Sequence, residues 1–273
     1  MKKIIIPFEG PSYRPELLEF VKALNDKSKV FLTAAFVPEV DYAQLWVPGS
    51  LMEGNVYIQP AEDEDKIVAR NSARVRRFCD DHGVGLRIHE DRFDFALAAI
   101  RKETRFADLL LLSNKHFFEI ISPSQPNAYM TEMLHDTECP ILLQPDEPRM
   151  PGEIVLAYDG SRASVYAIRQ FAYLFPEFSR VQTTLIYVDA KGKGEIPEQG
   201  LVRELGALHF RNFRLLRLSM HTDTFYDTWI GMMKDPWLVA GAYGRSDWSR
   251  LFSHSFINRM LNEHNVPLFL AHP

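Results

Sequence analysis

The amino-acid sequence predicts an α/β protein made of two similar units, each with five strands in a parallel sheet. Along the whole chain, short β-branched or leucine-rich runs alternate with amphipathic segments, which is typical of βαβ units. The start of the chain, KKIIIPFEGPS, has a counterpart in GEIVLAYDGSR at residues 152–162. Likewise ECPILLQP parallels NVPLFLAHP, and in each a proline precedes a short apolar run. This self-similarity predicts that one structural plan occurs twice.

The apolar runs of the first half predict strands near 3–7, 29–36, 84–90, 107–113 and 140–144. Its amphipathic segments predict helices near 14–25, 62–82, 93–104 and 126–137. This half is the longer one because of an insertion near 38–65, where prolines and glycines alternate with Trp46, Leu51 and Tyr57. These large apolar residues predict an ordered excursion rather than a flexible linker.

The second half repeats the pattern, with predicted strands near 153–158, 182–188, 213–219, 237–241 and 267–271. Its predicted helices lie near 161–175, 198–211, 222–232 and 254–264. Ser161 is expected to cap the helix after Asp159, because a serine side chain accepts a hydrogen bond from a free N–H group of the first turn. The proline-rich and charged segment QPDEPRMPGE predicts a boundary near 148, and hence domains at 1–147 and 148–273.

Length and composition limit the function classes. The 273 residues are 46% apolar and 25% charged, which suits two soluble globular domains. A net charge of -5 gives no overall cationic field for nucleic acid or an anionic membrane, so neither is expected as a partner. No run approaches the roughly 20 apolar residues of a membrane span, and MKKIIIP is too short for a signal peptide, so a cytoplasmic location is expected. Cys79 and Cys139 lack any CxxC spacing and are expected to be buried, reduced thiols.

The stretch GAYGRSDWSRLFSHS follows a predicted strand and carries residues suited to phosphate. Gly241 and Gly244 permit a tight turn that exposes N–H groups, while Ser253 and Ser255 lie at a predicted helix start, which favours anions. Two residues add positive charge in the same loop, Arg245 and Arg250. Each feature also has an ordinary structural interpretation, since strand-to-helix turns often contain glycine, serines cap helices and surface arginines are usually solvated.

The same edge of the predicted sheet offers contacts for a base. Ligands of open parallel sheets bind beyond the carboxyl ends of the strands, where both AYDGS and GAYGRS begin. Asp159 could accept a hydrogen bond from an adenine amino group, and the backbone around Tyr187 and Val188 could flank the ring. The alternative is that Asp159, which precedes Gly160, is only a turn residue.

Two concatenated units with AYDGSRAS after one strand and GAYGRSDWSRLFSHS after another resemble the universal stress protein family in its tandem form. That family's units are doubly wound, with five parallel strands and helices on both faces. Many members bind ATP through a Gly-x2-Gly-x9-Gly-Ser/Thr pattern. The resemblance implies that Asp159 contacts adenine and that Gly241 and Gly244 are the first two glycines. It also implies that the last strands, PILLQ and PLFLA, associate in an intramolecular pseudo-dimer, with a homodimer as a further option.

The sequence departs from the family pattern in both halves. His254 stands where the third glycine is expected, and Ser255 occupies the serine position. An imidazole there adds bulk near the phosphates, although a protonated ring could contact them. In the first half, Glu9 replaces the aspartate, and SNKHFFEIISPSQP has Ser113 and His116 in place of the glycines. These replacements predict a degenerate first site that binds no nucleotide.

The leading hypothesis is therefore a stress-response protein whose second domain binds ATP or another adenine nucleotide, with or without magnesium, and whose output is regulatory or protective. The alternative is an interaction module that binds no nucleotide. Slow ATP hydrolysis is a third option, but no metal-binding acid or general base is visible beside the loop. HTDTFYD, with His221 and Asp223, imitates a metal cluster but suits a loop and a helix cap, so no metal site is predicted. The four arginines of RNSARVRRF suit a solvated helix face or, alternatively, a patch for an acidic partner: Arg70, Arg74, Arg76 and Arg77.

Overall fold

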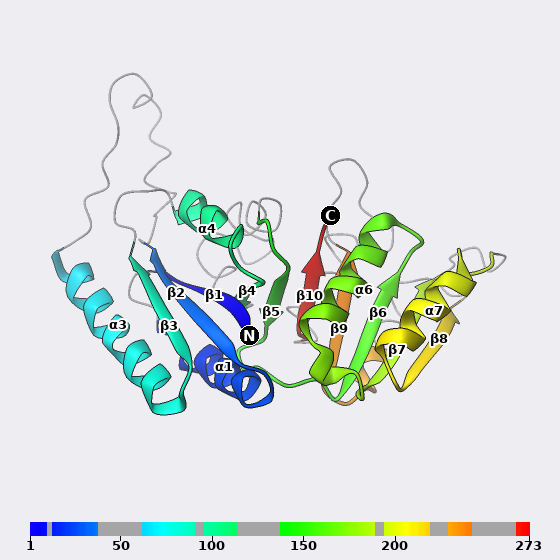
Figure 1. The fold of residues 1–273 in the computed structure, drawn as a ribbon, viewed down its shortest axis with the longest axis horizontal. Coiled ribbons are helices and arrows are strands. Elements are labelled where there is room, and N and C mark those ends of the chain that lie inside the picture. Colours follow the sequence, from blue (N-terminus) through cyan, green and yellow to red (C-terminus); the bar gives the residue numbers. More distant parts are fainter. Residues whose placement is uncertain are drawn as a thin grey trace, which may run out of the picture.

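The computed structural model places the two halves of the chain side by side, as Figure 1 shows. It describes residues 1–9, 13–37, 62–90, 96–113, 137–188, 194–218, 229–241 and 266–273. The predicted insertion lies for the most part outside these ranges, as do the predicted helices at 126–137 and 254–264 and most of that at 222–232. Among the described residues, no helix is long and apolar enough to cross a membrane.

The first half forms a parallel sheet with strand order β3-β2-β1-β4-β5. Its elements are β1 (Lys2–Glu9), α1 (Pro15–Lys27), β2 (Val30–Val37), α3 (Glu62–His82), β3 (Gly85–Glu90), α4 (Ala96–Thr104), β4 (Leu109–Ser113) and β5 (Ile141–Gln144). The short leucine run of β4 is buried along its whole length, as expected for a central strand of a parallel sheet.

The second half has a parallel sheet with strand order β10-β9-β6-β7-β8, which is the first half's order read from the opposite end. Its elements are β6 (Glu153–Tyr158), α6 (Arg162–Leu174), the short 3-10 helix η2 (Pro176–Phe178), β7 (Gln182–Val188), α7 (Gln199–His209), β8 (Phe213–Leu218), β9 (Pro236–Gly241) and β10 (Leu268–Ala271). The predicted α/β class and the predicted five strands in each half are confirmed.

The two halves share one ten-stranded sheet, because β5 and β10 pair at its centre. This is the only antiparallel pairing among the described strands, with Leu268 opposite Leu143 and Leu270 opposite Ile141. The expected association of the last strands, PILLQ and PLFLA, is therefore confirmed within the chain. Because all other pairings are parallel, strands of the two halves run in opposite directions. Their carboxyl ends consequently lie at opposite edges of the sheet.

Both faces of this sheet carry an apolar core that runs through both halves. Alternation along each strand divides the side chains, so that Ile4 and Ile6 lie on one face and Ile5 on the other. Helices α1, α3, α6 and α7 cover the first face, whereas α4 contributes to the second. At the boundary, the ring of Phe20 in α1 lies 5.9 Å from that of Trp237 in β9. The halves therefore contact each other through side chains as well as through paired strands.

A buried ion pair also joins the two halves. The ammonium group of Lys2, at the start of β1, contacts the Glu177 carboxylate of η2. The same ammonium group lies 5.2 Å from the centre of the Phe175 ring, which places the cation near an aromatic face. Only 9% of the Lys2 side chain and 12% of the Glu177 side chain are exposed. A break in this pair would leave a buried charge without its partner.

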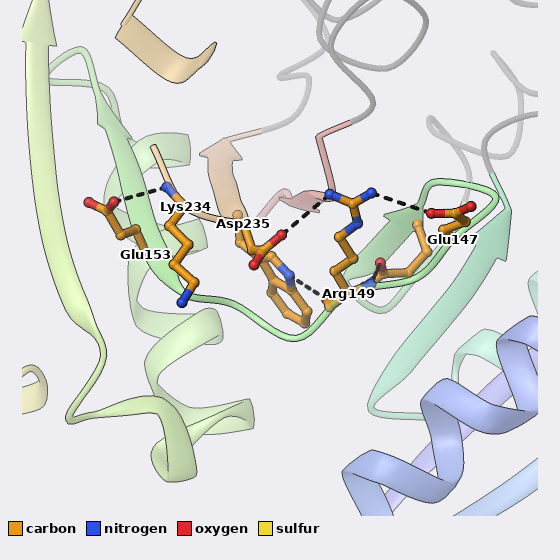
Figure 2. Close-up of polar contacts among 7 residues, drawn as sticks. Glu147, Arg149, Glu153, Lys234 and Asp235 are labelled. Carbon is orange, nitrogen blue, oxygen red and sulfur yellow. Dashed lines mark hydrogen bonds and ion pairs between the residues drawn. The ribbon is translucent and has the colours of Figure 1, made fainter. Parts of the chain in front are cut away.

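The segment between the halves is held against the start of β9, as Figure 2 shows. The Trp237 indole donates a hydrogen bond to the Arg149 carbonyl at 2.8 Å. The Arg149 guanidinium lies between two carboxylates, at 3.4 Å from both Asp235 and Glu147. Gly152 approaches the Lys234 carbonyl so closely that a Cβ atom would lie 2.5 Å from its oxygen. The predicted boundary segment is thus a fixed connection.

Candidate functional site

Three of the residues predicted to bind nucleotide lie at one edge of the second half. Asp159 follows β6, Val188 ends β7 and Gly241 ends β9. The register pairs Tyr158 with Tyr187, so Asp159 and Val188 occupy the next positions on neighbouring strands. β6 also pairs with β9, which brings Gly241 to the same edge. Carboxyl ends of neighbouring parallel strands are the usual ligand position in such sheets.

Asp159 and Ser161 organise the start of α6. The Ser161 backbone N–H donates to Asp159 Oδ1 at 2.9 Å, so the carboxylate closes a local turn. Gly160, between them, has φ +83°, a left-handed conformation that favours glycine. Ser161 Oγ accepts a hydrogen bond from the Ser164 N–H at 3.1 Å. The predicted helix cap is confirmed, and the carboxylate of Asp159 is oriented by a specific bond.

Gly241 has a packing reason to be glycine. A Cβ atom at this position would lie 2.5 Å from the Ala163 carbonyl carbon and 2.6 Å from the Ser164 nitrogen. The end of β9 therefore touches the first turn of α6 backbone to backbone, as an α/β unit requires for close strand and helix packing. The space that a side chain would fill here is occupied by α6, so the glycine alone is no sign of a ligand.

Tyr158 and Pro197 form part of this edge, although the sequence did not single them out. The Tyr158 hydroxyl donates to the Pro197 carbonyl at 3.0 Å, and the Tyr158 ring centre is 6.4 Å from that of Tyr187. Burial raises the pKa of Tyr158, and the carboxylates of Glu198 and Asp159 raise it further. The phenol therefore remains protonated at neutral pH and can donate. In the sequence Tyr158 has the pattern of an ordinary core residue, so its hydrogen bond to Pro197 emerges only from the fold.

Except for Gly241, the predicted phosphate-binding residues lie outside the described residues. These are Gly244, Arg245, Arg250, Ser253, His254 and Ser255. The structure thus describes the predicted base end of the site, through Asp159 and Val188, but only Gly241 of its phosphate end. His221 and Asp223 are likewise outside the described ranges. Within those ranges, no cluster of three or more histidine, cysteine or acidic residues is placed to hold a metal ion.

The first half has different groups at the equivalent positions. Ile4 pairs with Leu109 in the first half as Ile154 pairs with Trp237 in the second. Counting from these pairs, Glu9 corresponds to Asp159 and Ser113 to Gly241, as the sequence comparison expected. The Ser113 side chain is buried, so the first half accommodates a side chain at this position. In the second half the backbone of α6 occupies the corresponding space beside Gly241. His116 lies outside the described residues.

The turn into the first helix differs as well. The cap position Arg14 comes five residues after Glu9 and makes no side-chain capping bond, whereas Ser161 comes two residues after Asp159 and makes one. The side-chain cap at the start of α6 is therefore not repeated at the start of α1.

The other residues noted in the sequence have structural roles. Cys79 and Cys139 are free and buried, as expected. Burial raises the pKa of Cys79 to about 11 and that of Cys139 to about 12, so both thiols stay protonated and unreactive at neutral pH. In the arginine-rich helix α3, Arg74 stacks 3.6 Å above the Tyr13 ring and Arg77 lies 3.8 Å from Asp81. These contacts fit the solvated-face interpretation.

Comparisons with known proteins were made once this geometry was established. No family model matches the chain, and no curated protein sequence matches it. Solved structures do match over its whole length. A universal stress protein from Archaeoglobus fulgidus DSM 4304 superposes with a TM-score of 0.67 at 13% identity, covering 99% of this chain and 96% of that one.

Two further structures come from Pseudomonas aeruginosa. A candidate universal stress protein from strain UCBPP-PA14 gives a TM-score of 0.59 at 11% identity, with 100% of this chain and 94% of that chain covered. A functionally unknown protein from strain PAO1 gives 0.57 at 12% identity, with 100% and 93% covered. At these identities the likeness shows the fold, which extends over both halves. The chain therefore has the α/β fold found in universal stress proteins, as the sequence resemblance predicted.

Proposed function

We propose that this chain is a tandem universal stress protein, divided at 1–147 and 148–273, whose second domain binds an adenine nucleotide. Its output is regulatory or protective in a stress response rather than catalytic, and its location is cytoplasmic. The observation that carries the proposal is the convergence of Asp159, Val188 and Gly241 at the carboxyl ends of neighbouring strands. It is supported by the shared fold of universal stress protein structures.

The base end of the proposed site suits an adenine ring. Asp159 Oδ1 accepts from the Ser161 N–H, which restrains the carboxylate at the end of β6. A carboxylate oxygen is an acceptor for the amino group of adenine. The backbone at Val188, at the end of the neighbouring strand, is proposed to flank the ring. ATP, with or without magnesium, is the proposed ligand, and its phosphates would extend toward Gly244 and the serines at 253 and 255.

The first domain is proposed to bind no nucleotide. Glu9 and Ser113 replace the aspartate and the glycine, and α1 begins without a side-chain cap like that of Ser161 in α6. One ligand per chain is therefore expected. Two ligands per chain would contradict this part of the proposal.

Calorimetric titration with ATP tests the proposal directly. The most informative variant is Asp159→Asn, because its carbonyl oxygen can still accept from the Ser161 N–H while an NH2 group replaces the second oxygen. That group cannot accept from the adenine amino group, so binding should weaken by at least about tenfold. Asp81→Asn, an exposed change on α3, is the matched control and should bind as the wild type does. Absence of ATP binding by the wild type would favour the alternative of an interaction module.

A further inference from the structure

Residues 194–198 cross the carboxyl ends of the second-half strands just before α7. The Ile196 side chain is buried in the core on the face covered by α6 and α7. Pro197 lies over the turn after β6, where a Cβ atom at Gly160 would be 3.2 Å from both Cβ and Cγ of the proline ring. This segment, 194–198, therefore borders the turn that orients Asp159.

Two hydrogen bonds hold segment 194–198 to the strands beneath it. Tyr158, at the end of β6, donates its hydroxyl to the Pro197 carbonyl at 3.0 Å. Arg217, near the end of β8, donates from Nη1 to the Gly194 carbonyl at 2.6 Å. The Tyr158 side chain is only 1% exposed, whereas Arg217 is exposed to solvent. The tyrosine bond is the better protected from competing water and should contribute more to order.

The backbone of the segment needs such support. Glu198 has φ +47°, which is unfavourable for a residue with a side chain and persists only where the surroundings impose it. Glu198 directly follows Pro197, so the hydrogen bond from Tyr158 acts on the peptide unit that joins them. Loss of this bond should let the segment leave its position while the Tyr158 ring remains packed.

We propose that Tyr158 is a positioning residue for ligand binding: its hydroxyl fixes segment 194–198 as a preformed wall beside Asp159. This inference rests on the proposed nucleotide site. A wall that is already ordered adds no ordering cost when the ligand binds, so affinity increases. Tyr158 itself need not touch the ligand, because it acts through the Pro197 carbonyl.

Tyr158→Phe is the test variant, since it removes only the hydroxyl and retains the buried ring. The matched control is Tyr173→Phe. In the wild type, the Tyr173 hydroxyl accepts a hydrogen bond from Arg169 at 3.5 Å on the exposed side of α6. In ligand-free protein, hydrogen exchange in a peptide covering 194–198 should become about tenfold faster in Tyr158→Phe and remain unchanged in the control. ATP should bind about tenfold more weakly to Tyr158→Phe, with circular dichroism unchanged.

A second variant, Arg217→Met, removes the exposed hydrogen bond and should change exchange and affinity in the same direction by a smaller factor. If wild-type protein binds no ATP, the proposed function fails and the role in ligand binding fails with it. If wild-type and Tyr158→Phe proteins bind ATP equally, the inference is overturned while the proposed function stands. Unchanged exchange in segment 194–198 of Tyr158→Phe would also overturn it.

Discussion

Gly241 shows how one residue can serve the fold and the proposed site together. Its missing side chain lets the end of β9 touch the backbone of Ala163 and Ser164, which fixes the first turn of α6 beside Asp159. Glycine in a strand-to-helix turn suggests a phosphate site when only the sequence is considered. The contacts show that the same glycine is required for packing even without a ligand.

Gly241→Ala should therefore destabilise the ligand-free protein by about 2 kcal/mol, because the new methyl group meets backbone atoms that cannot move aside easily. Gly200→Ala on α7 is the control, since a Cβ atom there has nothing within 4 Å. Gly200→Ala should leave the unfolding free energy at the wild-type value or raise it by about 0.5 kcal/mol. Urea unfolding of both variants measures the difference, and equal stability of the two would refute the packing explanation.

Cys139 gives a prediction for alkaline pH. Burial, with a smaller effect of the Asp108 carboxylate, raises the thiol pKa from an ordinary value near 9 to about 12. Between these values the folded protein retains a proton that the unfolded chain loses. The stabilisation is thus complete below pH 9 and is lost as pH rises toward 12, with a slope of at most about 1.4 kcal/mol per pH unit.

The wild type should consequently lose about 1 kcal/mol more unfolding free energy between pH 8 and pH 10 than Cys139→Ala does. Urea titrations at the two pH values provide this comparison. The contributions of the other titrating groups cancel, because the wild type and Cys139→Ala share them. The same loss in both proteins would show that the thiol does not contribute.

At the scale of elements, the capped turn of α6 distinguishes the second half from the first. Ser161→Ala removes the acceptor for the Ser164 N–H and should cost about 1 kcal/mol of unfolding free energy. Ser161→Thr keeps a hydroxyl and should restore most of it. Chemical denaturation tests both variants. If Ser161→Ala had the same unfolding free energy as the wild type, another group would have to satisfy the freed N–H of Ser164.

Most elements could be predicted because their signals are local. Hydrophobic periodicity placed all ten strands within about two residues of their observed ends, and Ser161 as a cap followed from its side-chain chemistry. The contacts made by Lys2 and Tyr158 could not be predicted in this way. A lysine at position 2 has the pattern of a solvated charge, and its partner Glu177 is far away in sequence. Tyr158 has the pattern of an ordinary core residue, and only the fold brings the Pro197 carbonyl to its hydroxyl.

For the candidate site, the positions of the described residues could be predicted, but their packing contacts could not. Asp159, Val188 and Gly241 follow from strand ends, because neighbouring parallel strands must end at one edge. The packing role of Gly241 depends on where α6 lies and could not be derived from the spacing of glycines. Similarly, the segment between the halves has the composition of a linker, but the Trp237 hydrogen bond and the ion pair of Arg149 with Asp235 hold it against the start of β9.

At the scale of the whole molecule, the continuous sheet and the shared cores imply that the two halves unfold together. β5 pairs with β10, Phe20 packs near Trp237, and Lys2 contacts Glu177 across the boundary. These contacts bury apolar surface that a separated half would expose to water. A single cooperative unfolding transition is therefore expected for the full chain.

Lys2→Met should lower the stability of that single transition by about 3 kcal/mol, because it leaves the Glu177 carboxylate buried without a cation. Lys2→Met combined with Glu177→Gln should recover part of the loss. Lys22→Met, which breaks only the exposed 3.7 Å pair with Glu19 in α1, is the control and should cost less than about 1 kcal/mol. Denaturation followed by fluorescence and by circular dichroism reports the transition. Two separate transitions would contradict the joint unfolding of the halves.

The measurement that tests the central claim most directly is the unfolding free energy of the full chain as a function of ATP concentration, with and without magnesium. Binding of ATP to the wild-type protein should be saturable. At an ATP concentration of a hundred times the dissociation constant, the unfolding free energy should rise by about 2.7 kcal/mol, because the ligand binds only the folded state. Asp159→Asn should gain far less at the same concentrations. No gain by the wild type, or an equal gain by Asp159→Asn, would contradict an adenine nucleotide site at the end of β6.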